Sequence, residues 1–162
     1  MRYRIEFGQS DANRMKAQKF RQRVFRKSET GLDEDKFDKI SDHCLIFDQK
    51  KDDELVLVFR SRSFSSMKDI LCSYSAQYYD LTTLSVLPFK PMEIGRLCVD
   101  KRARDPFLLL TAFKYLASLI SIGGRDFIFG CTSFSGANNP KHLASLRALE
   151  LMGGVIIECF QG

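Results

Sequence analysis

The sequence predicts an α/β (α+β) fold in which helices cover both faces of a mixed sheet. Two observations carry this prediction. A strand, a helix and a hairpin come first, and the chain then alternates strand, helix, strand, helix, strand. Its 162 residues suit one domain at about 150 residues per domain. Since no repeat, low-complexity tract or linker interrupts the sequence, we expect a single domain over 1–162.

The first elements follow from periodicity. Tyr3, Ile5 and Phe7 alternate with charged residues, which is the period of a half-buried strand. Ser10 or Asp11 can cap a helix that runs to about residue 27.

A hairpin and an irregular segment come next. HCLIFD (43–48) and ELVLVFR (54–60) read as two strands joined by the polar turn QKKDD. In the stretch 66–90 the residues SMKDILCSYSAQYYDL indicate a short helix followed by a loop.

The second half begins with MEIGRLCVD (92–100), a strand whose internal glycine marks a bulge or a place where a ligand approaches the backbone. Asp105 and Pro106 supply the N-cap and first position of a helix that ends at the glycine pair 123–124. The remaining expected elements are a strand over 126–134, a helix over 141–152 and a last strand, VIIECF.

Composition excludes several classes of protein. Leu, Ile, Val and Phe make up roughly 30% of the chain, well above the ~20% typical of disorder. The five cysteines form no C-x-x-C pair, which argues against a disulfide scaffold or a structural zinc site, and we expect no metal. MRYRIEF lacks the apolar region of a secretory signal, and the longest apolar stretch, 107–122, is shorter than the ~20 residues of a membrane span. We therefore expect a soluble, cytoplasmic protein.

Charge is sorted along the chain. Residues 1–30 carry nine Lys/Arg against three Asp/Glu, whereas residues 31–55 carry four against nine. A basic opening beside an acidic loop suggests an acidic partner; a solvated helix face and a solvated loop are the alternative.

Charged residues also occur on strands that otherwise look buried. Arg60 ends one such strand, and Glu93 and Arg96 lie within another. Because an unpaired buried charge costs several kcal/mol, these side chains belong either to an internal ion-pair network or to a site. The sequence has no P-loop, dinucleotide-binding or serine-hydrolase motif, and its two histidines, His43 and His142, stand apart as structural and surface residues.

Seven charged or aromatic residues follow one another along the chain in a characteristic order and spacing. They are Arg21 and Phe25 (R-x3-F), Asp35 and Asp38 (D-x2-D), Arg60 at a strand end, and Glu93 and Arg96 (E-x2-R). This order resembles acyl-homoserine lactone (autoinducer) synthases, which have the GNAT N-acyltransferase fold. Five segments are more similar in sequence to ornithine–acyl carrier protein N-acyltransferases and related N-acyl amino acid synthases. They are FRQRVF, DEDKFDKISDHCLIFD, YSAQYYDLTTL, MEIGRLCVDKRAR and IFGCTSFSG.

The resemblance implies a mainly antiparallel sheet that is splayed between its fourth and fifth strands. It also implies a bacterial enzyme of ornithine-lipid biosynthesis that moves an acyl group from a carrier thioester to an amine without a covalent intermediate. Glu93 would be the base, directly or through water. The thioester carbonyl would be polarised by backbone N–H groups at Leu97, Cys98 and Val99.

The same resemblance assigns the acceptor side. Arg96 and Arg60 would orient Glu93 or bind the acceptor carboxylate. Arg21 and Phe25 would form the lid side of the pocket. Asp35 and Asp38 would place the lid or bind a cationic amine. The alternative for the whole set is an internal Arg–carboxylate network that fixes the first helix and its loop.

The donor turn departs from the usual GNAT pattern. Related enzymes cradle the diphosphate of coenzyme A in a glycine-rich turn, but here the turn reads DKRARDP. Lys101, Arg102 and Arg104 offer side-chain charge instead, which is compatible with phosphopantetheine on an acidic carrier protein. A solvated basic turn is the alternative, and no permanently bound cofactor is implied.

Two departures keep other functions open. The chain has no Trp, whereas the lactone synthases carry one in the lid, and it ends at Gly162 after a sixth expected strand where GNAT sheets usually have a seventh. A shortened relative, a truncated chain and a homodimer that shares its edge all fit this. Besides a lactone synthase, the alternatives are a plain acetyl-CoA acetyltransferase and a module that binds carrier protein or nucleic acid. Nucleic-acid binding gives no role to Glu93 and Arg96, so we expect none. Peripheral membrane contact is a further possibility.

Overall fold

The structure is a computed structural model that describes residues 2–103 and 105–131. Its elements are β1 (Tyr3–Gly8), α1 (Asp11–Arg26), the 3₁₀ helix η1 (Asp38–Ile40), β2 (Asp42–Asp48), β3 (Glu54–Ser63), the 3₁₀ helices η2 (Met67–Cys72) and η3 (Ser75–Gln77), β4 (Pro91–Val99), α2 (Pro106–Ile122) and β5 (Phe127–Phe129).

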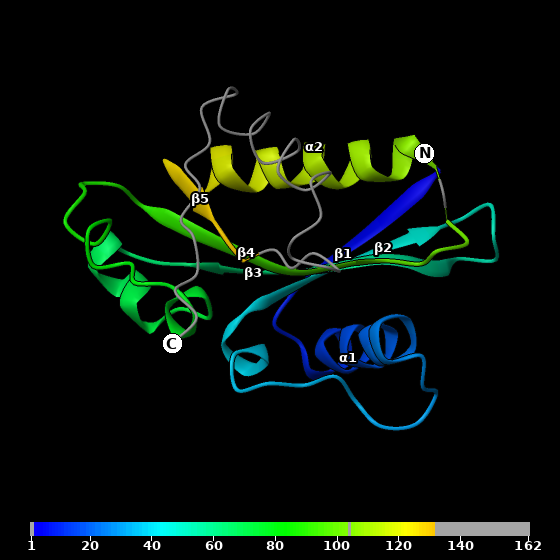
Figure 1. Cartoon of the computed structure of the whole chain (residues 1–162). Helices are drawn as coiled ribbons and strands as arrows, with labels where there is room; N and C mark the ends of the chain where they lie inside the picture. The colour runs from blue at the N-terminus through cyan, green and yellow to red at the C-terminus, as the bar shows by residue number, and fades with distance from the viewer. Residues whose placement is uncertain (1, 104, 132–162) are drawn as a thin grey trace, which may run out of the picture.

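The described strands form one sheet in the order β1-β2-β3-β4-β5. The first four strands pair antiparallel, and β5 lies parallel to β4. The helix α1 covers one face and α2 the other (Figure 1). This confirms the predicted mixed, mainly antiparallel sheet with helices on both faces.

The pairing of β5 with β4 is short. It joins Pro91, Met92 and Glu93 to residues 127–129, and β4 then continues to Val99 with only β3 paired to it among the described residues. The predicted splay between the fourth and fifth strands would begin beyond this pairing. The short pairing leaves one side of the middle of β4 without a described strand partner, which makes this stretch the place to look for a site.

Local sequence explains both helices. The Ser10 side chain caps α1 by accepting a hydrogen bond from the backbone N–H of Asn13 at 3.2 Å. Asp105 caps α2 by accepting from the N–H of Phe107 at 2.9 Å, and Pro106 occupies the first turn. Both helix starts therefore lie where the capping residues predict them.

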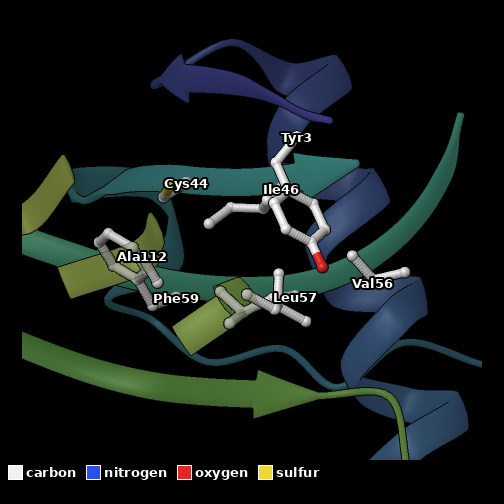
Figure 2. Packing of buried hydrophobic residues seen from close by; sticks show 8 residues of the cluster. Tyr3, Cys44, Ile46, Val56, Leu57, Phe59 and Ala112 are labelled. Atoms are coloured by element: carbon white, nitrogen blue, oxygen red, sulfur yellow. The ribbon is translucent and has the colours of Figure 1, made fainter. Parts of the chain in front are cut away.

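Alternation in the strands divides the core into two layers. On the α2 side, Tyr3, Cys44, Ile46, Val56, Leu57 and Phe59 pack with Leu108 and Ala112 (Figure 2). On the α1 side, Ala17 and Phe20 pack on Leu45, Phe47, Val58 and Cys98. The hydrophobic packing fixes both helices on the sheet, because each apolar side chain removed from water contributes about 1.5–3 kcal/mol.

The segment 66–90 forms two short 3₁₀ helices and loops, in line with the expected short helix and loop. A capping box between Ser66 and Asp69 starts η2. Phe64, Met67, Ile70 and Leu81 form a third buried cluster that holds the segment together.

Some boundaries differ from the predictions. The strand expected over 54–60 continues to Ser63, because β4 pairs with it over that length. The expected helix over 141–152, the strand VIIECF and the part of the strand 126–134 beyond residue 131 lie outside the described residues. Within residues 2–103 and 105–131, no helix combines the length and apolar character that crossing a membrane requires.

Two valines test the packing of the α1 layer. Val58 is fully buried and Val86 is 80% exposed. We expect Val58→Ala to lower the free energy of unfolding by about 2–3 kcal/mol, through lost burial plus a cavity, and Val86→Ala to change it by less than about 0.5 kcal/mol. Urea denaturation measures both; equal effects would contradict the layer assignment.

Candidate active site

A bulge distorts β4 just beyond its described pairing with β5. Val58 pairs with Cys98, but two residues later Arg60 pairs with Gly95, so β4 has one residue more than β3 across this interval. Arg96, inside the bulge, has a φ of 54°. A non-glycine residue in this region costs of order 1–3 kcal/mol, and such strain is concentrated at functional sites.

The glycine before the bulge faces open space. A Cβ built at Gly95 would meet no atom within 4 Å. The register shift opposite Val58 and Arg60, with the positive φ of Arg96, confirms the expected bulge in 92–100.

Charged side chains surround the bulge on the α1 side of the sheet. We call them the Arg–Asp network; its members are Arg21, Arg60, Arg96, Asp33, Asp35 and Asp38. The three carboxylates follow α1 in the acidic loop, and the three guanidinium groups come from α1, β3 and β4. The network therefore ties the loop to the helix and to two central strands.

Arg21 binds the loop from the helix side. Its Nε donates to Asp33 Oδ2 at 3.0 Å, and its Nη2 donates to the Asp33 carbonyl at 2.6 Å and to Asp38 Oδ2 at 2.7 Å. Gln18 adds a hydrogen bond to the same Asp38 oxygen at 3.0 Å. Arg21 and Asp38 are each 1% exposed, so their polar atoms are sealed from a substrate.

Arg60 and Arg96 bind the loop from the sheet side. Arg60 Nη1 lies 2.6 Å from Asp35 Oδ1 and 2.8 Å from Asp38 Oδ1. Arg96 Nη2 lies 3.0 Å from Asp35 Oδ2, and its Nη1 lies 3.7 Å from Asp33 Oδ2. The Asp35 carboxylate therefore bridges β3 to the bulge of β4.

The network fixes the charge state of its carboxylates. Burial alone would raise the pKa of Asp35, but the hydrogen bonds from Arg60 and Arg96 outweigh it and lower the pKa to about 2. Burial also acts against Asp38, and the hydrogen bond from Gln18 with the charges of Arg21 and Arg60 lowers its pKa. Both carboxylates are thus anionic at neutral pH.

Two aromatic rings cover the guanidinium groups. The Tyr74 ring lies 5.4 Å from the Cζ of both Arg60 and Arg96, and Phe37 meets Tyr74 edge to face at 5.6 Å between centroids. Burial, with a hydrogen bond to Tyr78, raises the pKa of Tyr74 to about 12. The phenol is therefore neutral, and its face stabilises the neighbouring cations.

Glu93 is held by a different element. Its Oε1 accepts hydrogen bonds from the N–H of Ser75 at 2.7 Å and from Ser75 Oγ at 2.6 Å, and its Oε2 accepts from the N–H of Tyr74 at 3.1 Å. The prediction that Arg96 or Arg60 orients Glu93 is wrong, because both guanidinium groups bind the loop carboxylates instead. Glu93 anchors the start of η3 to β4.

The structure thus assigns the predicted acceptor residues to different surroundings. Phe25 is 45% exposed and free to contact a ligand, whereas Arg21 and Asp38 are sealed and hold the loop. This matches the alternative in which an internal network fixes the first helix and its loop. Sequence reasoning missed Asp33, although it lies in the same acidic loop, and Tyr74, although it begins one of the quoted stretches.

The donor turn is more occupied by its own contacts than predicted. Arg102 donates to Asp100 at 2.8 Å and 3.1 Å and to Glu54 at 2.8 Å, so its charge is already balanced. The Asp105 carboxylate lies at the start of α2 and also binds Tyr3 Oη at 2.8 Å and Arg2. Lys101 is exposed, and Arg104 lies outside the described residues.

The predicted thioester residues form the end of β4. Leu97 is 44% exposed, whereas the Cys98 side chain is 1% exposed and belongs to the α1 layer of the core. Burial raises the pKa of the Cys98 thiol to about 12, so this thiol is not a nucleophile. Only the backbone at Leu97, Cys98 and Val99 is left for the predicted donor role.

This fold and site define a known class. Residues 15–113 match the family model described as acetyltransferase (GNAT) domain, which is more than half of the chain. The chain belongs to the GNAT acetyltransferase domain family.

Two curated relatives carry the name L-ornithine N(alpha)-acyltransferase. The protein from Rhodobacter capsulatus is 29% identical over 114 residues, which cover 68% of this chain and 44% of the relative. The protein from Brucella abortus is 26% identical over 155 residues, which cover 92% and 52%. These matches confirm the resemblance seen in the sequence, and the chain spans about half the length of these relatives.

Solved structures confirm the fold. An aminoglycoside acetyltransferase from an uncultured soil metagenomic sample has a TM-score of 0.60 at 12% identity, covering 100% of this chain and 97% of that chain. A second metagenomic aminoglycoside acetyltransferase, in complex with sisomicin, also has a TM-score of 0.60, at 11% identity, covering 99% and 95%. At this identity the likeness concerns the fold alone.

The network makes stability depend on pH in a stated window. Because the pKa of Asp35 is lowered to about 2 in the folded state, its contribution is complete above the ordinary pKa of 3.8 and is lost as the pH falls through about 2. We expect Asp35→Asn to destabilise the protein by about 2 kcal/mol at pH 6 and by progressively less between pH 4 and pH 2. Chemical denaturation across pH measures this. Asp52→Asn, at an exposed position, is the control, and a difference from wild type that stays constant with pH would contradict the role of Asp35.

Proposed function

We propose that residues 1–162 form one GNAT-type acyltransferase domain that transfers an acyl group from a thioester to the amine of a small amino acid such as ornithine. The observation that carries this proposal is the bulged stretch of β4, next to its short pairing with β5 and bordered by the Arg–Asp network. Family membership and the names of the two curated relatives support acyl transfer to an amino acid.

The reaction needs a polarised carbonyl and an amine that loses a proton. In the proposal, those backbone N–H groups at Leu97, Cys98 and Val99 that point away from β3 donate to the thioester oxygen as it gains negative charge. N–H directions alternate along a strand, and the N–H of Asp100 donates to Val56 of β3. The amine nitrogen forms a bond to the carbonyl carbon, the carbon–sulfur bond breaks, and the leaving thiolate takes up a proton. The strain at Arg96 keeps this stretch of backbone out of the regular ladder.

Glu93 is the proposed base. Its carboxylate accepts three hydrogen bonds from η3 and the residue before it. A carboxylate offers about four acceptor sites, so one on Oε2 is left for a water that relays the proton of the amine. Glu93 is 6% exposed, which favours relay through water over direct contact.

The donor in this proposal is acyl carrier protein, with acyl-CoA as the second candidate. A diphosphate at the start of α2 would meet the Asp105 carboxylate, which already accepts from the N–H of Phe107. On the α1 face of the sheet, Lys16, Lys19 and Arg23 line a second groove together with Glu29 and Glu54. Lys16 pairs with Glu6 and Arg23 with Asp100, so among the described residues Lys19 is the cation of this groove that remains for an acidic carrier protein. A pantetheine arm on a carrier protein has one phosphate in place of the diphosphate of coenzyme A, so it places less negative charge near the Asp105 carboxylate.

The other functions fit fewer observations. A lactone synthase is disfavoured because the chain has no Trp. A binding module without activity gives the strained bulge no role. A cytoplasmic location, a homodimer and peripheral membrane contact by an enzyme with a lipid product belong to the proposal, and nucleic-acid binding does not.

The base is tested by Glu93→Gln with Ser75→Ala as the matched control. Glutamine retains one oxygen that accepts hydrogen bonds from Ser75, but it cannot take a proton. Its amide NH2 faces the N–H of Tyr74 in place of an acceptor, so a thermal melt of the variant accompanies the rate measurement. We expect turnover to fall by about 10²–10⁴-fold in Glu93→Gln and far less in Ser75→Ala, which removes a hydrogen bond and leaves the carboxylate. Steady-state rates with product detection by mass spectrometry measure this, and similar losses in both variants would reduce Glu93 to an anchor.

The donor is tested by comparing acyl carrier protein and CoA thioesters of the same fatty acid. We expect a higher kcat/KM for the carrier thioester and a fall in this preference as salt rises, because charged surfaces steer the encounter. A preference for acyl-CoA that salt does not change would contradict the carrier assignment.

A further inference from the structure

A groove of about 430 Å³ lies beside the site, between the loop after α1 and the segment that contains η2 and η3. Its apolar lining comes from Phe37, Ile40, Leu71 and Ala76, and its polar lining from Lys36, Arg62, Cys72, Ser73 and Gln77. No acidic residue is among its lining residues. The groove therefore combines two cations with apolar walls.

The Arg62 guanidinium has no carboxylate partner. Among the arginines that the structure describes, all but Arg62 and Arg125 form ion pairs with Asp or Glu. Arg62 donates instead to the Cys72 carbonyl at 2.9 Å, and its Cζ lies 4.6 Å from the centroid of the Phe64 ring. The group is held in place by neutral partners and forms no ion pair with a described carboxylate.

The second cation, Lys36, lies in the same situation. Its Nζ stacks over the Phe37 ring at 5.2 Å and forms no ion pair in the described part of the chain. Asp33, Asp35 and Asp38 of this loop belong to the Arg–Asp network and do not line the groove. A groove with two cations and no acidic lining residue suits an anionic ligand.

The groove adjoins the proposed base through one short turn. Ser73 and Ala76 line the groove, while Tyr74 and Ser75 between them donate to Glu93. Arg62 also lies directly opposite Glu93 across the β3–β4 ladder. Directly opposite residues on neighbouring strands share a face at about 4.5–5.5 Å.

We propose that this groove binds the carboxylate of the acceptor amino acid, with Arg62 as the principal ligand and Lys36 as the second cation. This inference rests on the proposed function, since it names the side on which the acceptor of that reaction binds. A planar guanidinium pairs with a carboxylate through two parallel hydrogen bonds, which a lysine cannot do. The apolar walls pack on the hydrocarbon chain of the amino acid, and the two cations disfavour protonation of the nearby amine.

Binding without turnover tests the groove directly. The ligands are ornithine and 1,4-diaminobutane, which is the same chain without the carboxylate. By calorimetry we expect wild type to bind ornithine more tightly than the diamine. We expect Arg62→Gln to weaken ornithine binding about 10–100-fold, the range for a lost charged hydrogen-bonded pair, with the diamine unchanged.

Arg125→Gln is the matched control, because Arg125 also donates to a backbone carbonyl, that of Phe64 at 2.8 Å, but does not line the groove. It should leave ornithine binding unchanged. Lys36→Gln changes an exposed position, so this variant keeps the fold even if Arg62→Gln unfolds the protein. We expect Lys36→Gln to weaken ornithine binding as well. Unchanged ornithine binding in both groove variants, an equal loss for the diamine, or tighter binding of inorganic phosphate than of ornithine overturns the proposal.

The outcomes separate the groove from the proposed function. If wild type transfers no acyl group from any thioester but binds ornithine in an Arg62-dependent way, the acceptor site stands and the proposed reaction fails. If wild type makes N-acyl amino acids and Arg62→Gln leaves KM for the acceptor unchanged, the reaction stands and the groove assignment fails.

Discussion

The architecture of the site depends on the ion pairs between the loop after α1 and the two central strands. Asp35 bridges Arg60 of β3 to Arg96 of β4, while Arg21 holds the same loop from the helix. A buried charge that loses its partner costs several kcal/mol, so these contacts form together or the loop detaches. The position of the loop, and hence one wall of the groove proposed for the acceptor, is therefore set by electrostatics more than by apolar packing.

Two features converge on β4. The bulge at Arg96 diverts the backbone near the place where its described pairing with β5 ends, and Glu93, three residues earlier, anchors η3 through three hydrogen bonds. In the proposed function, one short stretch of strand thus offers backbone N–H groups to the thioester carbonyl and holds the carboxylate that acts as the base. In the proposed reaction the donor approaches from the open side of β4 and the acceptor from the side of η3. In the proposal, the Asp105 carboxylate at the start of α2 disfavours the diphosphate of coenzyme A there and thereby favours a carrier protein as the donor.

Much of the fold follows from the sequence because local signals are strong. Ser10 and Asp105 define both helix starts, and alternation in 43–48 and 54–60 defines the hairpin. Which charged side chains pair with one another was harder to predict from the sequence, because partners far apart in the chain meet only in the folded sheet. The sequence analysis expected Arg60 to orient Glu93, but Arg60 binds Asp35. Two of the three groups that bind Glu93 are backbone N–H groups, which no side-chain pattern encodes.

The central claim is that the bulged part of β4 receives the thioester. A crystal structure with a non-hydrolysable acyl-pantetheine bound tests it most directly. The account predicts that the acyl carbonyl accepts a hydrogen bond from a backbone N–H at Leu97, Cys98 or Val99, with the pantetheine along the side of β4 left by β5. A ligand seated elsewhere, with this backbone untouched, would contradict the account.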